Sequence, residues 1–180
     1  MRRFNESHPD GPLLLAGSEV DIRADGTLDY PDEVLRLLDV VIASVHSAMD
    51  QPREKMTARL VAAARHPAVT AIGHLTGRLI GRRDPVEVDV EAVLRACAEA
   101  GTWAEINAHP ARLDLREEHA RLAHELGVPL VINTDAHSAD HFGLATFGVG
   151  IARRAWLGPE AVINTLPTEQ FLRRLREKAR

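Results

Sequence analysis

Histidine and carboxylate side chains recur at regular intervals along this sequence of 180 residues. Glu19 and His46 are 27 residues apart, His46 and His74 are 28 apart, and so are His109 and His137. Imidazole nitrogens and carboxylate oxygens, without cysteine thiolates, suit zinc, manganese or iron. Two such ions held close together can activate a water molecule and stabilise the leaving oxygen of a phosphoester. The spacing therefore predicts metal-assisted hydrolysis, provided that a repeating fold brings these side chains together.

Apolar, β-branched runs precede these polar side chains and are typical of buried strands. The five runs are 13–22, 40–47, 69–76, 102–110 and 130–137. The helical patterns between and around them are 31–38, 51–66, 88–101 and 116–127. Strands that alternate with helices form a parallel sheet, and functional residues gather at the carboxyl ends of its strands. We therefore expect an α/β fold of about five parallel βα units with the polar side chains at one edge.

The last of these runs, PLVINTDAH, ends in Asp135 and His137. Residues two apart on a strand point to the same side, so we expect these two side chains to converge on one space. Asn107 and His109 end the preceding run with the same spacing. The residues that we expect to bind metal are Glu19, His46, His74, Asp135 and His137.

Two arginines follow strand ends directly: Arg78 comes after the run that carries His74, and Arg112 comes after NAHP. The planar guanidinium group suits phosphate, although salt bridges within the loops are the alternative role. The residues that we expect to contact substrate are Arg78, Arg112, Asn107 and His109. The adjacent Arg82 and Arg83 are expected to be solvated instead.

Several other classes of protein are disfavoured. The formal net charge of −4 argues against a general nucleic-acid coat, and no apolar run approaches the roughly 18 residues that span a bilayer. The single cysteine, Cys97, excludes an internal disulfide and favours a reducing cytoplasm. There is no G-x-S-x-G motif, and no P-loop or G-x-G-x-x-G follows a strand, so serine-nucleophile, NTP and dinucleotide chemistry have little support.

We expect a single domain over residues 1–180 in three parts. Residues 1–12 form a polar leader, 13–140 hold the βα units with the metal site, and 141–180 form a closing segment with C-terminal helices. The segment after His137 is expected to start extended or turned and then become helical. The last helix should present Phe171, Leu172 and Leu175 on one face. Five strands are too few for the usual eight-stranded barrel, so we expect an architecture that is incomplete on its N-terminal side.

The motifs GSEVDI, SVHS, GHLTGR, EINAHPARLDL and NTDAH follow one another at βα spacing. Together they resemble the polymerase and histidinol phosphatase (PHP) family, above all the C-terminal PHP domain of bacterial X-family DNA polymerases. The resemblance extends from about Leu13 to Leu175 and includes the ending ARRAWLGPEAVINTL. It implies a distorted (β/α)7 barrel with up to three divalent metal ions, manganese or zinc.

By this likeness Glu19 would bridge two metals, with His46 on one of them and Asp135 on the other. His74 and His137 would hold the third metal. Catalysis would then depend on Glu19 and Asp135. The resemblance implies a phosphoesterase, which in X-family polymerases acts as a 3′–5′ exonuclease and also on abasic sites and 3′-phosphates.

The sequence also departs from the family pattern. The family opens with a strand that ends in His-x-His and places further ligands soon after it, and this sequence contains neither. We therefore expect metal positions that lack ligands, an open sheet edge, and self-association or pairing with a separate N-terminal part. His109 stands where the polymerases more often have asparagine.

Two other functions stay open beside the DNA nuclease. The first is a small-molecule phosphatase of the histidinol-phosphatase type, and the second is a non-catalytic fragment. The expected substrate is accordingly DNA or a phosphorylated small molecule, and no membrane partner is expected.

Overall fold

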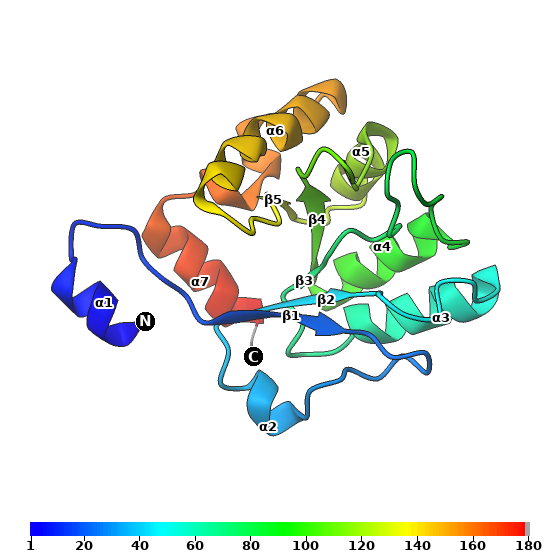
Figure 1. Cartoon of the computed structure of the whole chain (residues 1–180), viewed down its shortest axis with the longest axis horizontal. Helices are drawn as coiled ribbons and strands as arrows, with labels where there is room; N and C mark the ends of the chain where they lie inside the picture. Colours follow the sequence, from blue (N-terminus) through cyan, green and yellow to red (C-terminus); the bar gives the residue numbers. More distant parts are fainter. Residues whose placement is uncertain (179–180) are drawn as a thin grey trace.

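Five parallel strands form the centre of the fold in this computed structural model, which describes residues 1–178 (Figure 1). The strands are β1 (Gly17–Asp21), β2 (Val40–Ser44), β3 (Ala71–Ile72), β4 (Trp103–Asn107) and β5 (Leu130–Asn133). They pair in chain order, with β1 and β5 at the two edges of the sheet. The predicted α/β fold with five parallel βα units is thus confirmed.

Helices connect the strands and close the chain. They are α1 (Arg2–Ser7), α2 (Asp32–Leu35), α3 (Arg53–Ala64), α4 (Val90–Ala100), α5 (Glu117–Glu125), α6 (Ala145–Arg154) and α7 (Thr168–Lys178). Shorter 3-10 turns are η1 (Ala139–Leu144), η2 (Pro159–Ala161) and η3 (Ile163–Thr165). In α4, Asp89 accepts a hydrogen bond from the Ala92 N–H (3.0 Å), and Gly101 ends the helix with a φ of +66°. No helix within residues 1–178 is long and apolar enough to cross a membrane.

One segment differs from what the sequence predicted. The stretch that starts at Leu144 was expected to be extended or turned at first, but α6 begins at Ala145, directly after η1. The glycines of α6 lower its intrinsic helix propensity and hide its pattern, and packing against β4 and β5 stabilises the helix instead. Residues 1–12, the expected polar leader, include the short helix α1, and the rings of Phe4 and His8 stack 4.3 Å apart.

The sheet has two apolar faces because side chains alternate along each strand. Helices α3, α4 and α5 cover one face, and α7 lies on the other (Figure 1). Residues of the sheet on the α7 side are Val40, Ile42, Ala71, Trp103 and Val131. The Trp103 and Phe171 rings meet edge to face, with centroids 5.8 Å apart. Phe171, Leu172 and Leu175 all pack here, as the pattern of the last helix predicted.

The face that α7 covers becomes polar toward the carboxyl ends of the strands. The polar residues at alternate strand positions there are Glu19, Asp21, Glu105, Asn107 and Asn133. Register places Glu105 beside Val131, which contacts the α7 cluster, and places Asn107 beside Asn133. One face of the sheet is therefore divided in two. We call the apolar cluster that packs against α7 the floor, and the polar residues at the carboxyl ends of the strands, Glu19, Asp21, Glu105, Asn107 and Asn133, the polar rim.

Two glycines of α6 test how closely this helix packs on the sheet. A Cβ atom at Gly148 would lie 2.5 Å from Cγ2 of Ile132 and 3.0 Å from Cβ of Ala108, whereas one at Gly150 would meet nothing within 4 Å. We expect Gly148→Ala to lower the free energy of unfolding by about 1–3 kcal/mol through overpacking. Gly150→Ala, the matched control, should raise it by roughly 0.5–1 kcal/mol because alanine favours helix. Urea unfolding of both variants measures this difference, and equal effects would contradict the close packing.

Candidate metal centre

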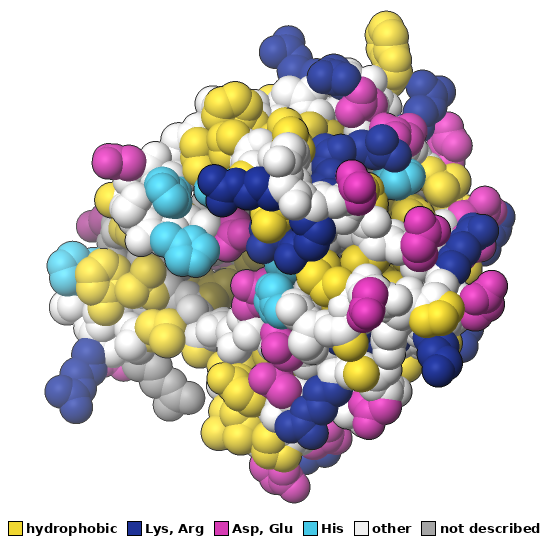
Figure 2. All heavy atoms as spheres, turned by 45° about the vertical axis from the view of Figure 1, so that its right-hand side comes forward, with side chains coloured by type: hydrophobic (Ala, Val, Ile, Leu, Met, Phe, Trp, Pro, Cys, Tyr) yellow, Lys and Arg dark blue, Asp and Glu magenta, His cyan; other side chains and the backbone are white. Residues whose placement is uncertain are grey.

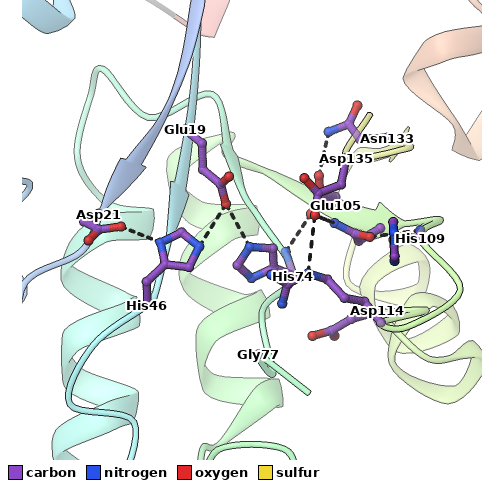
Figure 3. Close-up of polar contacts among 12 residues, drawn as sticks. Glu19, Asp21, His46, His74, Gly77, Glu105, His109, Asp114, Asn133 and Asp135 are labelled. Carbon is purple, nitrogen blue, oxygen red and sulfur yellow. Dashed lines mark hydrogen bonds and ion pairs between the residues drawn. The ribbon is translucent and has the colours of Figure 1, made fainter. Parts of the chain in front are cut away.

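Glu19, His46 and His74 converge at the carboxyl ends of the first three strands (Figure 3). Oε1 of Glu19 lies 2.8 Å from Nε2 of His74 and 3.2 Å from Nε2 of His46. One ligand atom from each residue lies within 4.8 Å of the other two. The sequence predicted all three as ligands, and the structure brings them together. The hydrogen bonds to both histidines lower the pKa of the Glu19 carboxyl far below its usual range.

Asp21 orients the His46 ring from the opposite side. Its carboxylate bonds Nδ1 of His46, so Nε2 is directed toward Glu19. A carboxylate that holds the distal nitrogen of a histidine fixes the ring for metal binding. The contacts with Glu19 and Asp21 outweigh burial and raise the pKa of His46 to about 9. In the metal-free chain, the His46 imidazole is therefore protonated at neutral pH.

A buried cation ties together the loops that follow β1 and β2. Arg59, on α3, has a side chain that is almost wholly buried. Its Nη1 donates to the carbonyls of Ser47 (3.0 Å) and Ala48 (3.2 Å), and its Nη2 donates to the carbonyl of Ile22. Ile22 directly follows Asp21, and Ser47 directly follows His46. The guanidinium group therefore fixes the backbone next to both of these site residues.

His74 is held in an unusual backbone conformation. Its φ is +23°, and the preceding Gly73 has no room for a side chain, because a Cβ there would lie 2.5 Å from Oγ of Ser44. The backbone N–H of His74 donates to Oε2 of Glu105 at 2.7 Å. The ring is almost fully buried, with Nε2 directed at Glu19. The carboxyl end of β3 is thus shaped to present a single nitrogen to the site.

Glu105 is the buried acid at the centre of the polar rim (Figure 3). Besides the His74 N–H, it accepts hydrogen bonds from Nδ2 of Asn133 (2.8 Å) and Nδ2 of Asn107 (3.3 Å). Burial raises the pKa of Glu105 despite these donors. Its oxygens are directed at strands β3, β4 and β5, so it positions residues of the site.

Asp135 and Arg112 form a second group beside this cluster. Oδ2 of Asp135 lies 3.4 Å from Nε of Arg112 and 3.4 Å from Nδ2 of Asn107. Nη1 of Arg112 is buried and has no hydrogen-bond partner among residues 1–178. Asp135 also has a positive φ of +53°. The predicted ligand Asp135 therefore lies on the polar rim, paired with a predicted substrate arginine and outside the three-residue cluster.

His137 lies further out. Strand β5 ends at Asn133, so Asp135 and His137 follow the strand and do not share a strand face as the sequence suggested. Nδ1 of His137 lies 2.8 Å from the carbonyl of Asp135, and 78% of its side chain is exposed. His141 stands between His137 and His109, with ring centroids 6.5 Å and 5.9 Å away. These three imidazoles form a separate group in which His137 is exposed and the other two are half-buried.

The other predicted substrate residues are engaged with the backbone. Nε of Arg78 donates to the carbonyl of Arg112 at 2.7 Å, and its Nη2 donates to the carbonyl of Leu113. Oδ1 of Asn107 accepts the N–H of His109 at 3.0 Å. Arg78 thus joins the loop after β3 to the loop after β4 and thereby positions Arg112.

Three residues of the site were not singled out from the sequence: Asp21, Glu105 and Asn133. Asp21 lies two residues after Glu19, and Glu105 lies two residues before Asn107, so alternation along the strand places each pair on one face. That spacing was the signal available, and it was applied only to Asn107 with His109 and to Asp135 with His137. Asn133 has no such polar neighbour on its strand, and only the register beside Asn107 places it in the site.

The donor set suits a divalent ion such as zinc or manganese. One carboxylate and two imidazole nitrogens converge there, and Asp21 supports one of the rings from behind. A divalent ion would replace the proton on His46 and separate the close contacts of Glu19 with both rings. The residues present therefore fit a metal ion.

Asp21 provides a test of metal binding that leaves every predicted ligand in place. We expect Asp21→Asn to weaken zinc or manganese binding by about 10- to 100-fold, because the ring of His46 loses its carboxylate partner. Isothermal titration calorimetry measures the change. Asp10→Asn, an equal change of charge at an exposed position, is the control. Unchanged affinity in Asp21→Asn would contradict the role assigned to Asp21.

The raised pKa of His46 predicts how the metal-free chain responds to pH. The folded-state pKa of about 9 exceeds the ordinary value of 6.5, so the stabilising contribution of His46 is complete below pH 6.5. It is lost as the pH rises through 9. We expect His46→Gln to flatten this part of the stability profile, measured as urea midpoints in EDTA, while His124→Gln, on the exposed side of α5, keeps it. Parallel profiles for all three proteins would contradict the coupling to Glu19 and Asp21.

Known proteins resemble this chain over most of its length, although no family model matches it. The DNA polymerase/3′-5′ exonuclease PolX of Bacillus subtilis is 46% identical over 164 residues, which are 89% of this chain and 29% of that protein. A probable phosphatase of Thermoanaerobacter sp. is 32% identical over 87% of this chain and 65% of its own length. The chain therefore spans less than two thirds of either relative.

A probable phosphatase of Acetivibrio thermocellus is matched more completely. It is 30% identical over 180 aligned residues, which cover 94% of this chain and 72% of that protein. The alignment thus includes the strands that carry the candidate metal centre as well as the helices that support them. Because the similarity extends over most of both proteins, this chain belongs to the family of that probable phosphatase.

Proposed function

We propose that this chain is a metal-dependent phosphoesterase of the PHP family. The observation that carries the proposal is the convergence of Glu19, His46 and His74 at the carboxyl ends of three parallel strands. The relatives support it, since one is named a 3′-5′ exonuclease and others are named probable phosphatases. Both names describe cleavage of phosphoester bonds.

The residues of the chain divide the work as follows. Glu19, His46 and His74 would hold one part of the metal centre, and Asp135 with His137 would hold the rest. Bound divalent ions supply an activated water and stabilise the charge on the leaving oxygen. Arg112 would contact the phosphate, because its buried Nη1 has no partner within residues 1–178 and its Nε lies beside Asp135.

We propose a DNA strand as the substrate, cleaved from its 3′ end or at a damaged site. The identity with the Bacillus subtilis protein, higher than with either phosphatase, favours this substrate. The single buried Cys97 suits the reducing cytoplasm, where we place the activity. The alternative is a phosphatase acting on small monoesters, which the names of the other relatives favour. Strand β1 pairs on one side only within residues 1–178, and we expect that edge to take a second chain.

The decisive experiment compares three esters in the presence of manganese or zinc. We expect hydrolysis of a 3′-labelled oligonucleotide and of bis(p-nitrophenyl) phosphate to exceed hydrolysis of p-nitrophenyl phosphate. Glu19→Gln and His74→Ala should each lower the rate by at least about 100-fold, since both remove groups that act in a single unit. Steady-state assays and metal analysis of each purified protein measure the effects.

Matched controls are Glu54→Gln and His124→Ala, which change the same residue types at exposed positions. Full activity in Glu19→Gln would contradict the metal mechanism. Cleavage of the monoester alone would favour the small-molecule phosphatase. Binding of less than one equivalent of manganese or zinc, with no hydrolysis, would identify a non-catalytic fragment.

A further inference from the structure

A cavity of about 440 Å³ is lined by none of the three residues of the candidate metal centre. It is lined by residues 78–85 and by Arg116, and we call it the arginine pocket. Four arginines, Arg78, Arg82, Arg83 and Arg116, line it together with one acidic residue, Asp84. This is a local excess of positive charge in a chain whose net charge is −4. Such a reversal concentrates anions.

Two of the arginines are fixed by the backbone. Nε and Nη2 of Arg83 donate to the carbonyl of Gly77 at 3.0 Å and 2.7 Å, and Arg78 binds the carbonyls of Arg112 and Leu113. Carbonyl contacts hold a guanidinium group in place but do not neutralise its charge. The pocket therefore has rigid positive walls.

The other two arginines keep donors free. Arg82 is exposed, and its side chain has no ion-pair or hydrogen-bond partner within the described part of the chain. Arg116 pairs with Glu118 at 2.8 Å, but its Nε is buried without a partner among the same residues. A buried unpaired N–H of a cation costs free energy unless a ligand satisfies it. The sequence predicted solvated side chains at Arg82 and Arg83, and Arg82 is exposed as predicted, whereas Arg83 donates to the carbonyl of Gly77.

Contacts connect the arginine pocket to the candidate metal centre. Residues 78–85 begin four residues after His74, and the loop is anchored by the Ile80 N–H to the carbonyl of Ala111 at 2.7 Å. Arg78 holds the carbonyl of Arg112, whose side chain reaches Asp135. Figure 2 shows histidine side chains around a hollow in this face, with Lys and Arg side chains bordering it. These contacts join the loop that lines the pocket to residues of the polar rim, so a ligand with several phosphates would be needed to occupy both places.

We propose that the arginine pocket binds a backbone phosphate of a nucleic-acid strand whose scissile phosphate lies at the metal centre. This deepens the proposed function, on which it rests, by assigning a second phosphate-binding position for the substrate strand outside the metal centre. Arg82 and Arg116 donate the contacts to the phosphate oxygens. Arg78 and Arg83 supply fixed positive charge. Contacts of this kind to the phosphates position a strand and carry no sequence information.

Fluorescence anisotropy in EDTA tests the pocket without any need for hydrolysis. The probe is a labelled single-stranded oligothymidylate of roughly a dozen nucleotides. Arg82→Ala and Arg116→Ala should each raise the dissociation constant roughly tenfold. Each should also reduce the slope of log K against log salt by about 0.7, the value for one lost phosphate contact on a single strand. Arg95→Ala, which removes an exposed arginine from α4, is the matched control and should leave both quantities unchanged.

Several results would contradict the proposal that the arginine pocket binds a backbone phosphate. Equal losses in Arg82→Ala, Arg116→Ala and Arg95→Ala would show that only total charge matters. Inorganic phosphate or thymidine monophosphate competing as well as the oligonucleotide, at equal phosphate concentration, would exclude a strand as the ligand. Polyglutamate competing equally would exclude phosphate as the recognised group.

The two proposals fail separately. If hydrolysis depends on Glu19 but oligonucleotide binding is unchanged in Arg82→Ala, the phosphoesterase proposal stands and the phosphate-binding role of the arginine pocket is wrong. If oligonucleotide binding depends on Arg82 and Arg116 but the chain hydrolyses no ester, the phosphate-binding role of the pocket stands and the phosphoesterase proposal is wrong.

Discussion

The buried carboxylate of Glu105 is the constraint on which the rest of the site depends. It accepts N–H groups that belong to the carboxyl ends of β3, β4 and β5, namely the backbone of His74 and the amides of Asn107 and Asn133. A carboxylate in this position costs several kcal/mol of desolvation, and only a complete set of donors offsets that cost. The three strand ends are therefore fixed relative to one another before any ligand arrives. The left-handed backbone of His74 is tolerated because this network holds it.

The division of one sheet face into floor and rim explains how a small fold supports such a network. Trp103 and Val131 pack with α7 toward the amino ends of their strands, and this apolar cluster excludes water from the α7 side of the polar network. Two or four residues further along the same strands, Glu105, Asn107 and Asn133 face the same way and meet one another. A single strand thus supplies both the apolar support and the polar group. Substitutions in the loops can change the reaction without disturbing the floor.

Much of the fold could be predicted from the sequence, because long helices and apolar strands have strong periodicity. The order of the elements, the parallel sheet and the cluster of Glu19, His46 and His74 follow from strand-end spacing. What could not be predicted depends on backbone conformation and long-range contacts. Strand β5 ends before Asp135, and the positive φ of Asp135 changes the direction of the chain. The two-residue spacing therefore gave a wrong prediction that Asp135 and His137 share one face of a strand. Arg78 looked like a substrate contact, yet its Nε and Nη2 bind carbonyls of the neighbouring loop. A local sequence pattern cannot predict such a contact, because the carbonyl of Arg112 lies 34 residues further along the chain.

Arg59 shows that the tolerance of this protein to mutation is not set by its candidate ligands alone. Its guanidinium group reaches carbonyls of two separate loops at once, those of Ile22 on one side and of Ser47 and Ala48 on the other. A lysine would keep the charge, but a single ammonium group on a flexible stem cannot reproduce the planar fork. An exchange that evolutionary comparisons treat as conservative would loosen the segments around Asp21 and His46 while every ligand stayed intact. Loss of function in such a lineage would leave no trace in the metal-binding motif itself.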